Sequence, residues 1–389
     1  MRVLCAAVTG PGHVYPVTAV ARALAKRGHE PILAFEERFR DLAAREGFPL
    51  APLPSIEPAD PAEFKPYDVS LAIARAYAPD VERIAPDAAV VDIITLGVAL
   101  ACEAAGVPFV TLSPHPLPYP SKDLAPFGAA RAPGRTAWGL RRDARGRARQ
   151  RIDLERGRDE CNAARVALGL RTFDRLDVAW SREAILVATP EALEPPRSDW
   201  LAQARVVGPC LYEPSGPLPA MPAGDGPLVL IAASTAHTGD VAGDAVRAVR
   251  RLGVRAIVTV GAGPAPDSGG DGRIVVTGDA PHGALLARAD ALVCNGGGGI
   301  VAGALAAGVP MVVVPGHGDQ RENGWRVERS GAGIVARTQR ELHRALKLVL
   351  RDESYRRAAT RIAADIATSD GPAEAAVAVE RLEKQREAG

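Results

Sequence analysis

The chain has 389 residues, which at roughly 150 residues per domain predicts two domains. Its 47 Lys and Arg residues nearly balance its 46 Asp and Glu residues, so it lacks the strong positive charge of a dedicated nucleic-acid-binding protein. Hydrophobic residues make up 47% of the chain, which is enough for two buried cores and too many for a disordered protein. Aromatic residues are scarce, at 4%, and only Trp325 and Tyr355 lie beyond Tyr212.

The cysteines and the lengths of the apolar runs indicate in which cellular compartment the protein is expected. The five cysteines are scattered and form no CxxC pair, which argues against a disulfide framework and against a zinc site. The apolar run within residues 1–8 is too short for a signal peptide, and no apolar run reaches the roughly 18 to 20 residues that a membrane helix needs. We therefore expect a cytoplasmic, soluble protein without an integral membrane segment.

Apolar strand-like runs alternate with helical stretches rich in Ala, Arg and Leu, a pattern that predicts parallel βαβ units. The first series has predicted strands at residues 3–8, 31–35, 88–91, 107–112 and 184–188, and helices at 17–27 and 37–46 and up to residue 106. The second series has predicted strands at residues 228–232, 255–260, 273–276, 291–294 and 311–314, and helices at 241–252, 283–287 and 300–307.

A stretch rich in Pro and Gly separates the two series and has the composition of a linker. We expect a Rossmann-like domain at residues 1–208, the linker at 209–227, a second Rossmann-like domain at 228–372, and a C-terminal helix at 373–389 that packs back on the first domain. Two doubly wound parallel sheets would then face each other across a cleft. Ligands of such sheets bind at the carboxyl ends of the strands.

Arginines dominate residues 141–158. Asp143, Asp153 and Glu155 are interleaved with them, so helical spacing would spread both charges around a solvated surface. The alternative is a surface that guides an anionic substrate or contacts a membrane.

A run of glycines directly follows the predicted strand at residues 291–294. Asn295 comes first, and then Gly296, Gly297, Gly298 and Gly299 lead into the predicted helix. Glycines let backbone N–H groups approach a phosphate closely, and a helix N-terminus supplies partial positive charge. The run is therefore a candidate diphosphate site, with a flexible turn between strand and helix as the simpler alternative.

The residues after the glycines carry a family resemblance. The chain reads ALAAGVP from residue 304, then a strand up to Pro315, the pair Asp319-Gln320, Asn323, and GAG from residue 331. This stretch resembles the C-terminal domain of the family 1 nucleotide-sugar-dependent glycosyltransferases, which have the GT-B fold of two Rossmann-like domains. In that family the Asp-Gln pair contacts hydroxyls of the transferred sugar, so the resemblance assigns this role to Asp319 and Gln320. The alternative for Asp319 is a simple helix cap.

The chain departs from the family on the donor side. The family's histidine before the glycines, which donates to the diphosphate, is replaced by Asn295, a neutral donor. Ser234 and Thr235 resemble the family's second phosphate-contacting loop, so donor binding is expected to rely on them and on the backbone. The plant branch of the family has a Glu that holds the ribose diol, and the matching residue here is Gly303. The absence of this Glu is compatible with a TDP-sugar donor, because deoxyribose lacks the 2′-hydroxyl, and a UDP-sugar donor remains open. The segment at Pro281 and His282 resembles the family segment that flanks the nucleobase. His282 would stack on the base there, or it lies at a surface turn.

The segment after the first predicted strand resembles the family's GH…P turn. Gly12, His13 and Pro16 match that turn, in which the histidine is the general base that deprotonates the acceptor. A neutral imidazole suits this task, and a carboxylate partner fixes its tautomer and stabilises the cation. Asp92, after the strand at residues 88–91, matches the family's carboxylate. The alternatives are local hydrogen bonding for His13 and a loop or cap role for Asp92.

Aromatic residues concentrate in the half that the resemblance assigns to the acceptor. The candidate acceptor-binding residues flank or follow its cleft-side loops: Tyr15, His115, Tyr119, Phe127 and Trp138. Flat apolar side chains suit a hydrophobic acceptor. Core packing explains many aromatic residues equally, and His115 could instead belong to a rigid Pro-rich surface loop.

The resemblance implies an inverting glycosyltransferase of the bacterial antibiotic-tailoring branch. It would move a sugar from a nucleotide diphosphate sugar to a hydrophobic natural product without an obligatory metal or other cofactor, because backbone dipoles can stabilise the leaving diphosphate. The expected partners are these two small molecules and no nucleic acid, and a homodimer is compatible with the sequence. Two alternatives remain open: a nucleotide-sugar epimerase of the same fold, and a catalytically silent nucleotide-sugar-binding protein, which Asn295 would favour.

Overall fold

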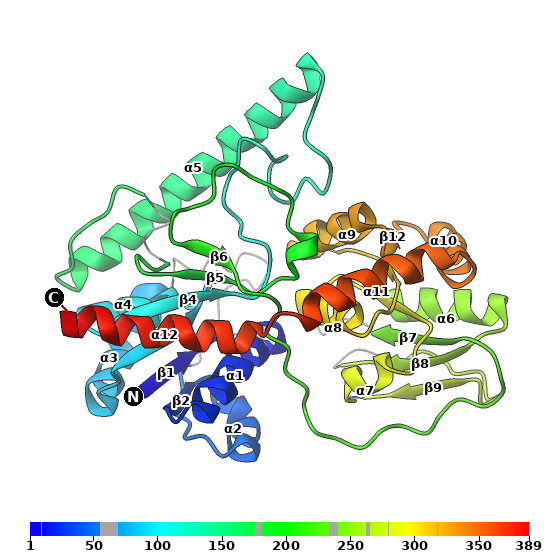
Figure 1. Ribbon diagram of the computed structural model, residues 1–389, viewed down its shortest axis with the longest axis horizontal. Helices are drawn as coiled ribbons and strands as arrows, with labels where there is room; N and C mark the ends of the chain where they lie inside the picture. Colours follow the sequence, from blue (N-terminus) through cyan, green and yellow to red (C-terminus); the bar gives the residue numbers. More distant parts are fainter. Residues whose placement is uncertain are drawn as a thin grey trace.

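The structure, a computed structural model, describes residues 1–8, 10–54, 69–175, 180–232, 240–261, 265–278, 280–316 and 318–388. Within these residues the strands form two six-stranded parallel sheets that lie in separate halves of the molecule, with helices packed against them (Figure 1). The strand orders are β2-β1-β3-β4-β5-β6 and β12-β11-β10-β7-β8-β9. Both are doubly wound, so the predicted GT-B architecture is confirmed.

The first sheet is buried on both faces. Its strands are β1 (Arg2–Ala6), β2 (Glu30–Ala34), β3 (Ala88–Asp92), β4 (Phe109–Ser113), β5 (Ile185–Val187) and β6 (Ala204–Val206). Its helices are α1 (Pro11–Lys26), α2 (Arg40–Glu46), α3 (Ser70–Ile84), α4 (Leu96–Ala104) and α5 (Ala137–Ala167), with short 3-10 turns η1 (Glu37–Phe39) and η4 (Glu191–Leu193). Successive residues of a strand face opposite sides, so Val3 and Cys5 pack with α1 whereas Leu4 and Ala6 pack with α3 and α4.

The second sheet repeats this arrangement. Its strands are β7 (Leu228–Ala232), β8 (Arg255–Thr259), β9 (Ile274–Thr277), β10 (Ala291–Cys294), β11 (Met311–Val313) and β12 (Gly333–Val335). Its helices are α6 (Val241–Leu252), α7 (His282–Leu286), α8 (Gly298–Ala306), α9 (Asp319–Ser330), α10 (Gln339–Arg351) and α11 (Glu353–Ala367). Val229 and Ile231 pack with α6 and α10, and Leu228 and Leu230 pack with α8 and α11.

Some elements differ from the sequence prediction. Helix α1 begins at Pro11, well before the predicted residue 17, because proline is favoured in the first helical turn, where its missing N–H has no partner to lose. Helix α8 begins at Gly298, within the glycine run. Strands β6 and β12 were not predicted, since three residues at a sheet edge show no usable hydrophobic period.

The chain passes from one domain to the other twice, first near Gly208 and again near Gly371, and the two connecting segments are in contact. A Cβ added at Gly208 would lie 2.8 Å from Ser369 Oγ, and a Cβ added at Gly371 would lie 2.5 Å from Gly208 O. After the second crossing, α12 (Gly371–Ala388) lies along α1 on the first domain (Figure 1), where Ala376 and Val379 join its core. The two crossings thus form one close-packed connection between the domains.

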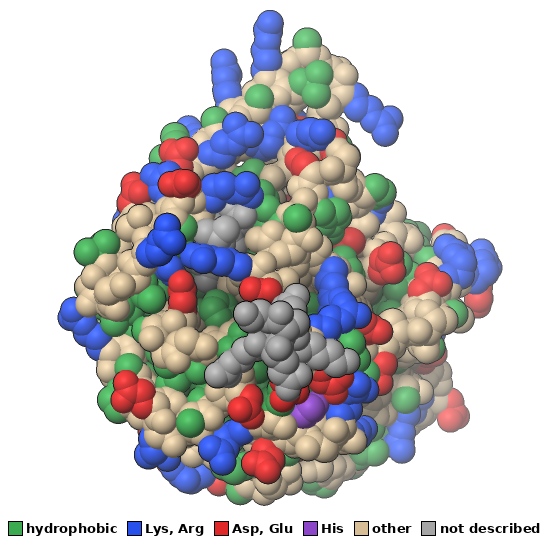
Figure 2. Space-filling model, turned by 60° about the vertical axis from the view of Figure 1, so that its left-hand side comes forward, with side chains coloured by type: hydrophobic (Ala, Val, Ile, Leu, Met, Phe, Trp, Pro, Cys, Tyr) green, Lys and Arg blue, Asp and Glu red, His purple; other side chains and the backbone are tan. Residues whose placement is uncertain are grey.

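Helix α5 projects beyond the body of the molecule at one end (Figure 1), and Figure 2 shows basic side chains at this end, which in α5 are all arginines. Arg141, Arg145 and Arg149 are exposed, in agreement with a solvated surface. Asp143, in contrast, is 1% exposed and pairs with Arg131 and Arg142. Although α5 is long, none of the described helices has the length and apolarity needed to cross a membrane.

Candidate active site

His13 and Asp92 meet at the carboxyl edge of the first sheet. His13 lies in the first turn of α1, and Asp92 is the last residue of β3, the strand next to β1. His13 Nδ1 lies 2.9 Å from Asp92 Oδ2, while Asp92 Oδ1 accepts a hydrogen bond from Ile94 N at 3.0 Å. Asp92 is 1% exposed and the side chain of His13 is 22% exposed. Because Asp92 engages Nδ1, Nε2 is the ring nitrogen available to a reacting proton.

The pKa of His13 depends on both domains. Burial alone would lower it, because burial disfavours the charged ring. The charge and hydrogen bond of Asp92 act in the opposite direction, as does the charge of Asp319 on α9, and together they raise the pKa of His13 above its ordinary value. The contribution of Asp319 means that the second domain brings this carboxylate into the neighbourhood of His13.

The glycine run forms a tight turn between β10 and α8. Gly296 has φ of 87°, in the region that residues with a Cβ avoid. A Cβ at this position would lie 2.8 Å from Val313 Cγ1 and 2.9 Å from Gln320 O. Gly297 is the N-cap of α8. The first glycine is therefore required by conformation and by close packing, which a merely flexible turn would not need.

The start of α8 lies against the first domain. Gly298 and Gly299 are in the first helical turn, and a Cβ at Gly298 would lie 2.9 Å from Pro114 O. Pro114 follows β4, so the carboxyl edges of the two sheets approach each other here. A Cβ at Gly299 would meet no atom within 4 Å. The backbone amides of this turn have no partner inside the helix, which makes the turn a candidate anion site.

Asp319 opens α9, and its side chain reaches the glycine turn through Asn323. The N-cap of α9 is Gly318, so the interpretation of Asp319 as the helix cap is wrong. Asn323 Nδ2 donates to Asp319 Oδ2 at 3.0 Å and to Gly296 O at 2.9 Å. Asn323 is 3% exposed. It therefore fixes Asp319 relative to the predicted diphosphate turn, a role that the sequence motif had not revealed.

Gln320 and Asn295 are buried and hydrogen bonded to the backbone. Gln320 Oε1 accepts from Gly316 N at 2.9 Å, and Asn295 Nδ2 donates to Val314 O at 3.4 Å. They are 7% and 4% exposed. Both side chains thus support the loop after β11 next to the glycine turn.

The remaining donor-side predictions lie at the same edge or outside the described residues. His282 starts α7, and its Nε2 lies 2.9 Å from Thr259 Oγ1 at the end of β8, so it is held at the carboxyl edge of the second sheet. Ser234 and Thr235 fall outside the part of the chain that the structure describes. Within the described part, no group of three or more His, Cys, Asp and Glu side chains is arranged to hold a metal ion.

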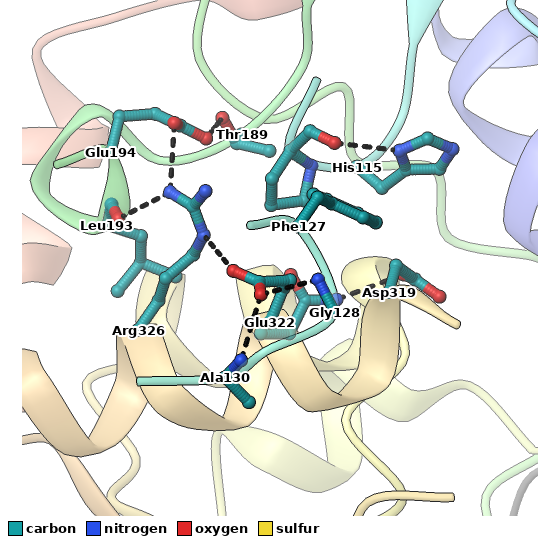
Figure 3. Close-up of polar contacts among 12 residues, drawn as sticks. His115, Phe127, Gly128, Ala130, Thr189, Leu193, Glu194, Asp319, Glu322 and Arg326 are labelled. Atoms are coloured by element: carbon teal, nitrogen blue, oxygen red, sulfur yellow. Dashed lines mark hydrogen bonds and ion pairs between the residues drawn. The ribbon is translucent and has the colours of Figure 1, made fainter. Parts of the chain in front are cut away.

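Three of the predicted acceptor residues follow β4 on the side of the second domain. The ring centroid of His115 lies 5.9 Å from that of His13, with the ring planes nearly perpendicular. Tyr119 and Phe127 lie further along the same segment and line a small cavity together with Glu322. Figure 3 shows Phe127 between His115 and α9. The structure therefore places these side chains along the domain junction.

The structure does not bring Tyr15 and Trp138 together with the others. Tyr15 packs against the core of the first domain, with its ring 5.0 Å from that of Tyr212. Trp138, in the first turn of α5, is 71% exposed and lies under the guanidinium of Arg142, 5.1 Å from the ring centre. Its inclusion among the site residues is therefore not supported, because the sequence did not show that a long helix leads away from the junction.

Sequence reasoning missed a buried polar group between the domains (Figure 3). Arg326 of α9 is 2% exposed, donates to Leu193 O at 3.1 Å and lies 2.9 Å from Glu194 Oε2. Glu322 lies one turn before Arg326. In the sequence, this spacing is that of an ordinary solvent-exposed helix pair, and nothing marks Glu194 as a partner from the other domain.

The comparisons with known proteins agree with this fold. The family model "Erythromycin biosynthesis protein CIII-like, C-terminal domain" matches residues 244–382. The chain is 29% identical to 4'-demethylrebeccamycin synthase of Lentzea aerocolonigenes, over 98% of this chain and 99% of that protein. It is also 33% identical over 176 residues to a PGL/p-HBAD biosynthesis rhamnosyltransferase of Mycobacterium bovis, covering 43% of this chain and 39% of that protein.

Solved structures extend the likeness over nearly the whole chain. The glycotransferase of kitacinnamycin superposes with a TM-score of 0.78 at 22% identity, covering 98% of each chain. The chain therefore has the GT-B fold. The Streptomyces sp. SF2575 glycosyltransferase SsfS6, in a structure with thymidine diphosphate, superposes on this chain with a TM-score of 0.67 at 22% identity, covering 98% of this chain and 99% of that one.

Proposed function

We propose that this protein is a glycosyltransferase that transfers a sugar from a TDP-sugar to a hydroxyl of a hydrophobic natural product, with inversion at the anomeric carbon and His13 as general base. The observation that carries the proposal is the pair of His13 and Asp92, joined at 2.9 Å, in the electrostatic field of Asp319 from the other domain. A base, its orienting carboxylate and a candidate sugar-binding group thus converge where the two sheets meet.

The proposed reaction is a single displacement. Asp92 accepts from His13 Nδ1–H, which leaves neutral Nε2 to take the proton of the acceptor hydroxyl. The acceptor oxygen bonds to the anomeric carbon as the bond from that carbon to the diphosphate breaks, and the diphosphate leaves with the bonding electron pair. Attack from the side opposite the leaving group inverts the configuration. Asp92 then stabilises the imidazolium that has formed.

The donor would lie along the edge of the second sheet. The first-turn amides of α8 suit the diphosphate, and Asp319 suits sugar hydroxyls because a carboxylate accepts two or more directional hydrogen bonds. The neutral Asn295 is bonded to Val314 O, so the backbone would carry most of the interaction with the diphosphate. Gly303 in place of a ribose-binding Glu supports TDP, as do the thymidine diphosphate complexes of SsfS6 and of VinC, which has a TM-score of 0.70.

The acceptor would lie along the segment after β4. His115 is next to His13, and Tyr119 and Phe127 offer flat apolar surface at the domain junction. The relative named 4'-demethylrebeccamycin synthase, which matches the chain over nearly its full length, supports a natural-product acceptor.

The proposal is tested by assaying TDP- and UDP-sugars against a panel of apolar hydroxylated acceptors. Products are detected by mass spectrometry, and their anomeric configuration is determined by NMR. His13→Ala should lower turnover by roughly 10²- to 10⁴-fold. The affinity for thymidine diphosphate, measured by calorimetry, should not change, because His13 is not a donor-binding residue in this proposal.

The matched control is His343→Ala, which removes a partly buried histidine of α10 outside the site and should leave transfer unchanged. Retained turnover in His13→Ala, or a product with retained configuration, would contradict the proposed mechanism. Equal use of UDP-sugars would contradict the TDP preference alone.

A further inference from the structure

A carboxylate of the second domain holds the segment between β4 and α5. Glu322, on α9, accepts hydrogen bonds at a single oxygen, Oε1, from Gly128 N at 2.8 Å and from Ala130 N at 3.1 Å (Figure 3). The side chain of Glu322 is 7% exposed. Hydrogen bonds to a carboxylate are stronger than those between neutral groups, and burial strengthens them further. Helix α9 therefore fixes the backbone of residues 128–130.

The backbone of this segment is strained where Glu322 holds it. Ala130 has φ of 49°, in the left-handed region that residues with a Cβ avoid. Ala85 is the other such residue among those described, but it is the C-cap of α3, where this conformation commonly ends a helix. Ala130 ends no helix, so its conformation has no such local cause. The contact to Glu322 supplies the cause from another domain.

Glu322 is itself positioned by a buried network. Arg326 Nε lies 3.9 Å from Glu322 Oε2, and Arg326 Nη1 donates to Leu193 O and to Glu194 Oε2. Thr189 Oγ1 donates to Glu194 Oε1 at 2.9 Å. The side chains of Arg326 and Glu194 are 2% and 5% exposed. Moving any of these charges would leave another buried without its partner, so the network keeps Glu322 in one place.

The held segment carries the aromatic residues that face the domain junction. Phe127 directly precedes Gly128, and it lines a gap of about 10 Å³ together with Tyr119, Glu322 and Trp325. This gap has room for at most about one water molecule, so these side chains are closely packed. The position of Phe127 therefore depends on the backbone that Glu322 fixes.

We propose that Glu322 is a positioning residue for acceptor recognition. By holding Gly128 and Ala130 it places Phe127 on the acceptor side of the junction, without itself contacting the donor or His13. The proposal rests on the proposed function, because the acceptor is that of the proposed transfer. It also means that α9, which begins with the candidate sugar-binding residue Asp319, shapes the acceptor side as well.

The test compares two substitutions of Glu322. Glu322→Ala removes the acceptor of both backbone hydrogen bonds and should raise the KM for the acceptor by about tenfold or more, with little change in kcat or in the KM for the donor. Glu322→Gln keeps an oxygen that can accept both bonds and should restore most of the acceptor KM. A merely structural role would instead lower kcat and raise both KM values, and that result would overturn the proposal.

Hydrogen exchange of the intact protein gives a readout that needs no substrate. The amides of residues 128–130 should exchange about tenfold faster or more in Glu322→Ala and remain protected in Glu322→Gln. The matched control is Glu328→Ala, which removes an exposed carboxylate of the same helix and should change neither exchange in this segment nor acceptor KM.

The outcomes separate this proposal from the proposed function. Absence of transfer by the wild-type protein would overturn the proposed function and, with it, the acceptor role of Glu322. Unchanged exchange and unchanged acceptor KM in Glu322→Ala, in a protein that does transfer sugar, would overturn the positioning role alone.

Discussion

The carboxyl edges of the two sheets are equipped with different chemical groups. In the first domain, β1 and β3 lead to His13 and Asp92, two ionisable side chains in direct contact. In the second domain, β10 leads to a glycine turn, and the residue before the glycines is the neutral, buried Asn295. The first edge carries a side chain that can exchange a proton, whereas the second presents backbone amides that can bind an anion without titrating.

This difference predicts two kinds of sensitivity to substitution. A site made of side chains is disabled by an isosteric change that removes one charge, while the protein stays folded. A site made of backbone is disabled through conformation, so its loss should be accompanied by a loss of stability. The same Rossmann-like architecture thus supports two sites that fail in different ways.

The largest expected effect comes from Asp92→Asn, which keeps the size of the buried side chain. Asparagine carries no charge and does not impose the Nδ1–H tautomer on His13, so transfer should fall by roughly 10²- to 10⁴-fold. The residual activity should also show a shifted pH profile. In the wild-type protein the active neutral form of His13 is lost as the pH falls through a pKa that Asp92 holds above its ordinary value. Without that carboxylate the pKa falls, and the acid limb of kcat/KM moves to lower pH.

The control for this substitution is Asp87→Asn, at the opposite end of β3. Asp87 is exposed and accepts from Arg2 N, so its replacement should leave the rate and the pH profile unchanged. An acid limb that stays in place in Asp92→Asn would show that the proton chemistry of the first edge does not depend on this pair.

A smaller effect on transfer, with a clear effect on stability, is expected from Gly296→Ala. The new Cβ would lie 2.8 Å from Val313 Cγ1 at φ of 87°, so strain and overpacking should cost about 2–4 kcal/mol of unfolding free energy and weaken nucleotide binding. Denaturant unfolding and calorimetry with thymidine diphosphate measure the two effects. For stability, Gly299→Ala is the matched control, since it has open space and should gain up to about 1 kcal/mol of helix propensity. If the two variants were equally stable, the carboxyl edge of the second sheet would not depend on the backbone conformation of Gly296, and the comparison of the two edges would be wrong.

The contact between His13 and Asp92 could be predicted because parallel strands bring their carboxyl ends to one edge. The strand at residues 88–91 and the turn after residue 8 were both recognisable, so the two side chains were expected to face one cleft. The glycine turn was predicted for a similar reason, since a buried strand before it and an apolar helix after it leave one arrangement. Helix α1 was predicted to start late because Gly10, Pro11 and Gly12 are typical of a turn, although Pro11 begins the helix.

The network around Arg326 could not be predicted, because its partners come from segments that only the tertiary fold brings together. Glu194 and Glu322 are far apart in the chain, and the backbone groups that Glu322 binds carry no signal in the sequence. Trp138 illustrates the opposite case, a residue whose type suggested more than its position supports. Its residue type suggested acceptor binding, whereas its position on a projecting helix leaves it 71% exposed.

The smallest expected effect tests charges that belong to neither edge. Glu380, on α12, accepts two hydrogen bonds from Arg27, at 2.7 and 2.8 Å, and pairs with His29 at 3.0 Å, and these contacts lower its pKa to about 2. A lowered carboxyl pKa stabilises the fold above the ordinary carboxyl pKa, and this stabilisation is lost as the pH falls through about 2. Because Arg27 is 40% exposed, Glu380→Gln should cost about 1 kcal/mol or less at pH 7, and less still in high salt. The exposed Glu383→Gln is the control, and both variants should transfer at the wild-type rate. A marked loss of transfer in Glu380→Gln would mean that the docking of α12 controls how the two edges meet.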